Sequence, residues 1–257
     1  MLELCNINKT FNKGTIDEKK LFTDFNIKIN EKEFVSVIGS NGSGKTTMLN
    51  IISGDVMPDS GCVTINGKDI TKSANYKRAK NISRVFQDPS SGTCPTMTIF
   101  ENLSIADNKG KSFNLTKGLN TARKKFYQTQ LETLGMGLEN RLGTLAGGLS
   151  GGQRQALALI MATLSEPDIL LLDEHTAALD PKSADIVMNL TDKVVKDKKI
   201  TTIMITHNLR YAAEYGSRTV MMHEGKAILD VSGEKKNNKS INDYLKIFNE
   251  ISIECGN

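Results

Sequence analysis

A glycine-rich segment near residue 40 carries the residue types that bind nucleotide phosphates. It follows the apolar run 34–38, an expected buried strand, and leads into an expected helix over 46–53. Glycines let backbone N–H groups wrap a phosphate, a lysine offsets its charge, and a threonine hydroxyl can hold magnesium. A glycine-rich turn without a ligand is the alternative, but the match to G-x-x-x-x-G-K-[ST] is complete. The predicted phosphate loop, with Thr47 close by, comprises Gly39, Ser40, Asn41, Gly42, Ser43, Gly44, Lys45 and Thr46.

Two adjacent carboxylates, Asp173 and Glu174, follow a second apolar run at residues 169–172. Buried strands often end in solvated acids, so this pattern alone is weak evidence. Beside a phosphate loop, it predicts a strand-end site for nucleotide hydrolysis. Asp173 would then orient the magnesium shell, and Glu174 would polarise the attacking water.

A second glycine-rich segment, residues 149–153, also leads into a helix-like run. Helix N-termini and free backbone N–H groups are natural anion sites. A chain with two of them needs either two ligands or a reason to bring both segments to one ligand. The residues alone leave both possibilities open.

Composition excludes several classes of protein. The 257 residues carry 33 basic and 29 acidic side chains, spread along the chain for a net charge of +4, so nucleic acid is not indicated as the main partner. No apolar run approaches the roughly 18 residues of a membrane span, and the first residues lack a signal-peptide pattern, so a cytosolic place is expected. The four cysteines lack metal-binding spacing, so we expect free thiols at Cys5, Cys62, Cys94 and Cys255.

The order of apolar patterns predicts the layout of the chain. Residues 1–30 read as antiparallel strands, and later strands alternate with helices, which implies a mainly parallel sheet. Residues 90–166 have helix-spaced apolar residues and little strand signal. Residues 232–239 read as a loop or linker, and a capping box at Ser240 to Asp243 begins an amphipathic helix. That helix packs on its own domain or binds a partner, through Ile241, Tyr244, Leu245, Phe248 and Ile251.

The segment at 149–153 resembles the signature motif of the ATP-binding cassette (ABC) ATPases, and it stands just upstream of the strand that ends at Asp173. Gln87 resembles the family's Q-loop residue, Asp180 its D-loop residue and His207 its switch histidine. The resemblance covers residues 1–231 as one ABC ATPase domain, followed by the linker and terminal helix of 232–257. It implies an α/β P-loop NTPase with a mainly parallel core sheet (1–89 and 167–231), an N-terminal antiparallel β subdomain and a helical insertion subdomain (90–166).

The resemblance also implies roles for particular residues. Glu174, His207 and Gln87 would serve catalysis on ATP, with Mg²⁺ held by Thr46, Gln87 and Asp173. Phe11 would stack on adenine, or it packs within the edge sheet. The signature residues would meet the phosphates held by a second ATPase subunit, in a head-to-tail pair closing over two ATP: Leu149, Ser150, Gly151, Gly152 and Gln153.

Two features point to a subfamily. His175 follows the catalytic glutamate where most members have proline, and the run from Phe86 to Leu103 also departs from the general pattern. At both places the sequence resembles that of the ATPase components of bacterial importers for aromatic amino acids such as tryptophan or tyrosine. This implies permease subunits docking near residues 87–102, an extracytoplasmic solute-binding protein, a second copy of this chain as the usual partner and a place on the cytoplasmic face of the membrane. An exporter ATPase and a soluble ABC factor acting on ribosomes, DNA or the division apparatus are the alternatives.

Overall fold

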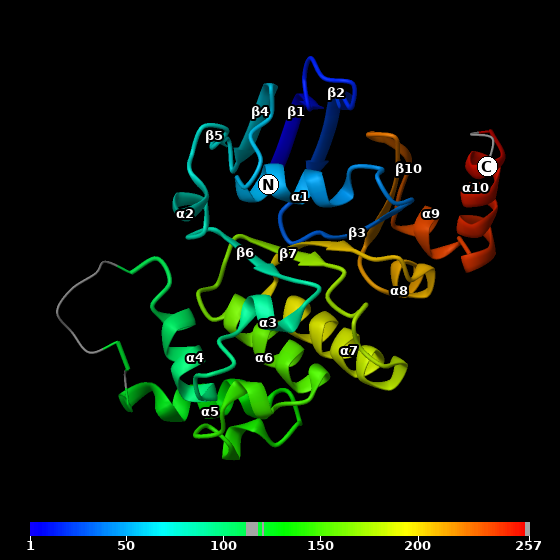
Figure 1. Ribbon diagram of the computed structural model, residues 1–257. Helices are drawn as coiled ribbons and strands as arrows, with labels where there is room; N and C mark the ends of the chain where they lie inside the picture. The colour runs from blue at the N-terminus through cyan, green and yellow to red at the C-terminus, as the bar shows by residue number, and fades with distance from the viewer. Residues whose placement is uncertain (112–117, 120, 255–257) are drawn as a thin grey trace. The chain divides into compact units, whose positions relative to one another are not determined.

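The computed structural model describes residues 1–111, 118–119 and 121–254, without the side chains of 251–254. It divides into two compact units, one of Met1–Arg78 with Thr201–Asn257 and the other of Ala79–Ile200. Cys255, the side chain of Ile251, and residues 112–117 and 120 of the predicted helical insertion lie outside this description. Each unit is built around its own strands (Figure 1).

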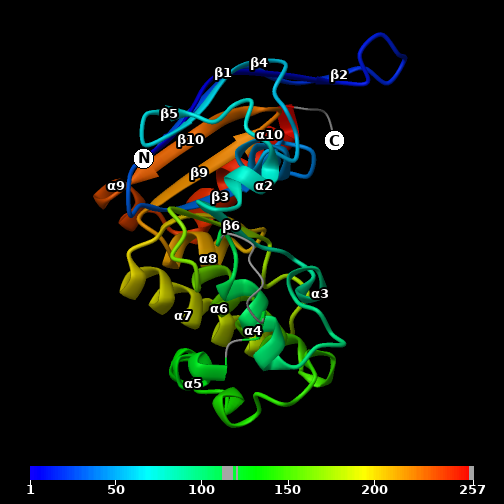
Figure 2. The same ribbon diagram turned by 90° about the vertical axis from the view of Figure 1, so that its left-hand side faces the viewer.

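An antiparallel sheet forms the N-terminal part of the first unit, as predicted. Its strands are β1 (Leu2–Phe11), β2 (Lys19–Ile29), β4 (Ser60–Ile65) and β5 (Lys68–Asp69), in the order β2-β1-β4-β5. Figure 2 shows β1, β2 and β4 running side by side. Leu2 and Leu4 are buried, and Cys5 of β1 lies opposite Cys62 of β4. These two cysteines and Cys94 are free thiols, as expected.

A second group of strands in this unit is mainly parallel. Strand β3 (Phe34–Gly39) pairs in parallel with β8 (Thr201–Ile205) on one side and β9 (Arg218–His223) on the other, and β10 (Lys226–Ser232) pairs antiparallel with β9. All six residues of β3 are buried, as is typical of an inner strand of a parallel sheet. Helix α1 (Lys45–Ser53) follows β3 and ends at Gly54, which has a φ of 84°. The short helix α2 (Asn75–Arg78) completes this stretch.

The C-terminal helices belong to the same unit. They are α8 (Leu209–Glu214), α9 (Glu234–Asn237) and α10 (Ile241–Glu254). The predicted capping box is present, since the Ser240 hydroxyl accepts a hydrogen bond from the Asp243 N–H at 3.3 Å and the Asp243 carboxylate accepts one from the Ser240 N–H at 2.7 Å. Tyr244 is buried in a cluster with Ile38, Ala212 and Met221, so α10 packs on its own unit.

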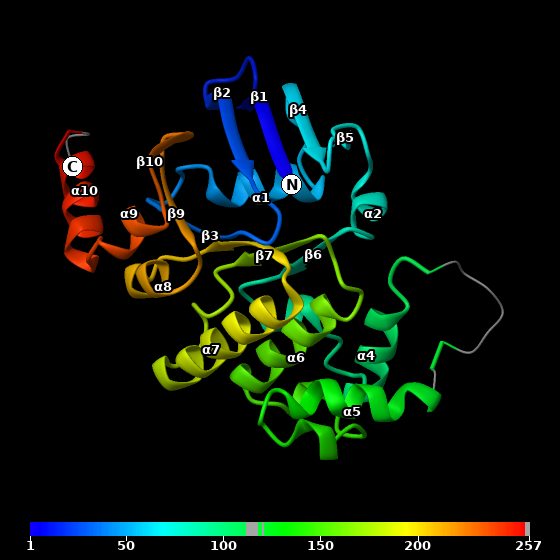
Figure 3. The same ribbon diagram turned by 180° about the vertical axis from the view of Figure 1, so that it is seen from behind.

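The second unit combines two parallel strands with helices. Strand β6 (Ile82–Val85) pairs with β7 (Ile169–Asp173). The main helices are α3 (Pro89–Gly92), α4 (Ile99–Asp107), α5 (Lys124–Glu132), α6 (Gly151–Thr163) and α7 (Pro181–Lys198), seen from behind in Figure 3. Short 3₁₀ turns lie at Thr121–Arg123, Leu138–Asn140 and Ala146–Gly148. None of the helices that the structure describes is long and apolar enough to cross a membrane.

Candidate functional site

Two glycines of the phosphate loop, Gly39 and Gly44, occupy positions that only glycine fits. Gly39 ends β3 with a φ of 151°, and a Cβ there would lie 2.1 Å from the carbonyl oxygen of Met222 in β9. Gly44 has a φ of 105°, and a Cβ there would lie 2.8 Å from the Phe22 ring. The loop therefore turns from β3 into α1 in a conformation that larger residues would disrupt.

Lys45 begins α1 and is buried against the loop. Its Nζ atom donates hydrogen bonds to the carbonyl oxygens of Gly39 at 2.8 Å and Ser40 at 2.9 Å. The helix starts at Gly44 without a side-chain cap and without an acidic residue in its first turn. The loop thus combines a lysine with a helix N-terminus, and both attract an anion. Thr46 is exposed and Thr47 is half-buried.

His207 and the phosphate loop both follow the carboxyl ends of neighbouring parallel strands. His207 lies two residues after the end of β8, and its side chain is exposed. Strand β8 runs parallel to β3, the strand that leads into the loop. A role for His207 toward a bound phosphate requires this shared edge. A second histidine, His223, ends β9 with Nδ1 3.4 Å from the Oγ atom of Ser40. Nothing in the local sequence marks His223 as a neighbour of the loop.

Phe11, the candidate adenine-stacking residue, ends β1 opposite Lys19 of β2 and is half-buried. The Nζ atom of Lys9 lies over its ring, 5.3 Å from the centroid. The same ammonium pairs with Asp59 at 3.5 Å. The ring therefore already has a cation as a neighbour, and its stacking on adenine stays a prediction.

In the second unit, the two adjacent carboxylates stand at the end of β7. Asp173 is the last residue of the strand, and Glu174 follows it with a φ of 49°, in the left-handed region. The Nη2 atom of Arg84 lies 2.5 Å from Oδ2 of Asp173, and both side chains are largely buried. Arg84 was not among the predicted site residues, because its pairing depends on the register between β6 and β7.

His175, the residue after Glu174, contacts helix α7. It is buried, and its Nε2 atom lies 3.1 Å from the Oγ1 atom of Thr191, whose hydroxyl donates to the carbonyl oxygen of Val187 at 2.8 Å. That hydroxyl has only one proton, so Nε2 must be the donor in the bond to Thr191. Burial lowers the pKa of His175 to about 4, so the ring is neutral near pH 7.

The second glycine-rich segment forms the N-terminus of α6. The Ser150 hydroxyl accepts a hydrogen bond from the N–H of Gln153 at 3.3 Å, and Gln153 Oε1 accepts one from the N–H of Ser150 at 3.2 Å. A Cβ at Gly152 would lie 3.2 Å from the Ser183 side chain, so glycine allows the close approach of α7. Asp180 caps α7 by accepting a hydrogen bond from the Ser183 N–H at 3.0 Å, and its bonds to Ser183 lower its pKa.

Two neighbouring side chains of α6 contact the segment that carries Gln87. Gln87 itself is exposed, but the carbonyl oxygen of Phe86 accepts a hydrogen bond from Nε2 of Gln155 at 3.0 Å. Gln155 is fully buried. Arg154 lies with Nη1 3.3 Å from the hydroxyl of Ser90. The predicted Q-loop and the signature helix are therefore joined by direct hydrogen bonds within one unit.

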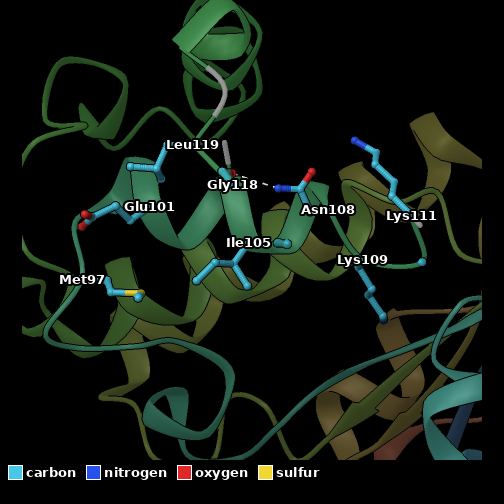
Figure 4. Close-up of a pocket in the computed structure, with 10 residues that line it drawn as sticks. Met97, Glu101, Ile105, Asn108, Lys109, Lys111, Gly118 and Leu119 are labelled. Carbon is cyan, nitrogen blue, oxygen red and sulfur yellow. Dashed lines mark hydrogen bonds between the residues drawn. The ribbon is translucent and has the colours of Figure 1, made fainter. Parts of the chain in front are cut away.

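A hollow of about 690 Å³ lies along α4 (Figure 4). Met97, Ile105 and Leu119 give it an apolar lining, and Ile105 and Leu119 are 55% and 45% exposed. Glu101, at its margin, forms a capping box with Thr98 that begins α4. The T-x-x-E spacing at 98–101 is a capping-box pattern, a helix-start signal that the sequence alone carries. The hollow borders the region 87–102, where a permease is predicted to dock.

The residues predicted to hold magnesium carry hard oxygen donors. These are the hydroxyl of Thr46, the amide oxygen of Gln87 and the carboxylate of Asp173. Within the residues that the structure describes, no group of three or more His, Cys, Asp and Glu side chains could hold a metal by itself. Mg²⁺ usually binds through one or two carboxylates together with substrate phosphates. The donor set therefore fits an ion that arrives with a nucleotide.

Known proteins resemble this chain in sequence and in fold. A family model described as ABC transporter matches residues 22–177. A tyrosine transport ATP-binding protein of Clostridioides difficile (strain R20291) is 49% identical, over 96% of this chain and 98% of that protein. The thiamine import ATP-binding protein ThiQ of Shigella flexneri serotype 5b (strain 8401) is 34% identical, over 79% of this chain and 82% of that protein. A solved dimeric ATP-binding cassette, MJ0796 in a post-hydrolysis state bound to ADP and Pi, has a TM-score of 0.73 at 30% identity, over 90% of this chain and 98% of that chain.

Proposed function

The chain belongs to the ABC transporter family as an ATP-binding subunit that hydrolyses ATP, and from this premise we propose that it drives the uptake of an aromatic amino acid. The observation that carries the proposal is the 49% identity, over nearly the full length of both chains, to a tyrosine transport ATP-binding protein. The thiamine import relative is less similar and covers less of the chain. The thiamine relative is named for import, which favours an importer over an exporter.

Hydrolysis needs groups that position ATP and stabilise charge more than it needs covalent chemistry. In this proposal, the phosphate loop and Lys45 bind the phosphates and His207 contacts the γ-phosphate. Glu174 polarises the attacking water. Thr46, Gln87 and Asp173 hold magnesium, which neutralises phosphate charge when bound. The uncapped start of α1 and the position of His207 at the same strand edge support these roles.

The proposed active form is a head-to-tail pair of subunits. In it, the signature residues of one subunit contact the ATP held by the phosphate loop of the other. Ser150 and Gly151 are exposed at the start of α6, where a partner's nucleotide could reach them. The similarity to a dimeric cassette at 30% identity supports this arrangement. Asp180, the D-loop residue, would lie near the contact between the two subunits.

The remaining partners follow from the importer role. Permease subunits in the membrane would dock near residues 87–102, where the exposed Gln87 and the apolar hollow along α4 offer a surface. An extracytoplasmic solute-binding protein would deliver the substrate. The chain would then work at the cytoplasmic face of the membrane.

A reconstituted system tests the substrate. The chain is purified with its permease and placed in liposomes, the solute-binding protein is supplied on the substrate side, and ATP-dependent uptake is measured for radiolabelled tyrosine, tryptophan, leucine and thiamine. Of the four solutes, we expect only the aromatic amino acids to be taken up. Glu174→Gln should abolish that uptake. Uptake of thiamine or leucine instead would contradict the proposed substrate. Co-purification with ribosomes in place of a permease would contradict the transport role.

A further inference from the structure

Asp173, the carboxylate assigned to magnesium, already has a cation beside it. Arg84 lies opposite Leu171 in the parallel pairing of β6 with β7. Paired residues of neighbouring strands share a face of the sheet, and so do residues two apart on one strand. Arg84 therefore shares a face with Leu171 and, through it, with Asp173. The Arg84 Nη2 atom reaches Asp173 Oδ2 at 2.5 Å, and the two side chains are only 13% and 14% exposed. This is a charge-assisted hydrogen bond in a place where water screens it weakly.

Neighbouring residues hold the guanidinium in position. Its Cζ atom lies over the Phe86 ring, 5.0 Å from the centroid, which is a cation–π contact. Phe86 is anchored in turn by the hydrogen bond that its carbonyl accepts from the fully buried Gln155. Arg84 therefore has an anion and an aromatic ring as neighbours. Asp173 is the last residue of β7, and the backbone of Phe86 is bonded to α6.

We propose that Arg84 is a resident counter-ion of Asp173 that competes with magnesium for this carboxylate. The inference rests on the proposed function, because it takes Asp173 as a residue that serves the ion. A fixed positive charge beside the carboxylate opposes the approach of a divalent cation. Arg84 thus raises the magnesium concentration that is needed to fill the metal site of the nucleotide-bound protein. When no nucleotide is present, its positive charge balances the negative charge of Asp173.

Metal affinity gives a direct test. Full-length protein with a non-hydrolysable ATP analogue is titrated with Mn²⁺ as a spectroscopic substitute for Mg²⁺, and free Mn²⁺ is followed by electron paramagnetic resonance. Removing one unit charge a few ångström from the ion should tighten Mn²⁺ binding on the order of tenfold in Arg84→Gln. Arg141→Gln is the matched control, because it removes the same charge from an exposed position of the same unit, and its affinity should stay unchanged.

A double-mutant cycle separates this inference from the proposed function. In an Asp173→Asn background, Arg84→Gln should no longer tighten Mn²⁺ binding, because the carboxylate for which the two cations compete is gone. If Asp173→Asn alone leaves Mn²⁺ affinity unchanged, the assignment of Asp173 to the metal is wrong, and the inference falls with it. If Asp173→Asn weakens binding but Arg84→Gln has no effect or weakens it too, the competition is wrong and the metal assignment stands.

Folding of the variants is checked independently. Circular dichroism and binding of the analogue without metal should match wild type, because the proposed phosphate contacts come from the phosphate loop. Should Arg84→Gln not fold, Arg84→Met serves instead, since it keeps an unbranched stem against Phe86 and also removes the charge. The same tightening is expected from it, and wild-type affinity in that variant would overturn the proposal.

Discussion

Glu174 is the residue on which the chemical step should depend most. Glu174→Gln keeps the shape of the side chain and removes the carboxylate that we propose polarises the attacking water. We expect hydrolysis to fall about 100- to 1,000-fold, the usual contribution of a general base. ATP binding should persist, because Lys45 and the phosphate loop are unchanged. Single-turnover hydrolysis and equilibrium binding of ATP measure the two effects separately.

The matched control for this prediction is Glu132→Gln, which makes the same change at an exposed position at the end of α5. It should hydrolyse ATP at the wild-type rate. A Glu174→Gln variant that also hydrolyses near that rate would show that another group activates the water.

His175 should make the free energy of unfolding depend on pH. Its pKa is about 4 in the folded chain, against about 6.5 for a free histidine. The stabilising effect of this lowered pKa is complete above pH 6.5 and is lost as the pH falls toward 4, because only the unfolded chain then takes up the proton. Between pH 7.5 and pH 5 this residue should cost about 2 kcal/mol. Urea unfolding at both pH values measures the loss.

Other groups also titrate in this range, so the comparison is with His175→Gln. Glutamine can still donate to Thr191 but takes up no proton, so its loss of stability between the two pH values should be smaller by about 2 kcal/mol. Equal losses in the two proteins would mean that His175 can be protonated in the folded chain.

At the scale of elements, local signals predicted the helices and strands well. The start of α7 is readable from local signals, because Asp180 caps the helix and Pro181 fits its first turn. The predicted bounds of the strand before the phosphate loop and of the helix after it are right to within one residue. The strand is a continuous apolar run, and the helix ends at a glycine. The hydrogen bond of His175 to Thr191 was not predictable, because it depends on how a loop residue packs against a later helix.

The predicted linker at 232–239 shows what a polar sequence conceals. It contains α9, in which Lys236 is buried and donates hydrogen bonds to the carbonyl oxygens of Ala213, Tyr215 and Gly216 at 3.1, 2.8 and 2.7 Å. These acceptors lie around the C-terminal end of α8. In the sequence, this lysine looks like its exposed neighbours, because its partners lie about 20 residues away. Lys236 joins α9 to α8 just before α10 begins.

Lys236→Met should therefore destabilise this unit. Methionine keeps the apolar stem but leaves three carbonyl groups without the ammonium that satisfies them. We expect a loss of about 2–3 kcal/mol in the free energy of unfolding, measured by urea denaturation. Lys235→Met, at the exposed neighbouring position, should change stability by no more than about 0.5 kcal/mol. Equal stability of the two variants would show that the Lys236 contacts contribute little.

At the scale of the whole molecule, the central prediction is that one copy of the chain cannot complete an ATP site. The signature motif was recognisable from its residues and their order, but the partner that it serves lies outside a single chain. If the active form is a dimer, dilution should lower the rate per subunit, and the total rate should approach the square of the protein concentration. ATPase assays beside analytical ultracentrifugation measure this. A rate strictly proportional to concentration, with only monomer present, would contradict composite sites.

Mixing two inactive variants tests the same prediction without dilution. Lys45→Ala removes the phosphate contact, and Ser150→Arg blocks the signature segment, so each variant alone should form only defective sites. A mixed pair would hold one site with both wild-type halves. Random pairing places half of the chains in such pairs, so an equal mixture should recover roughly a quarter of the wild-type rate. If each chain completed its own site, the mixture would show no more than the average of the two separate rates.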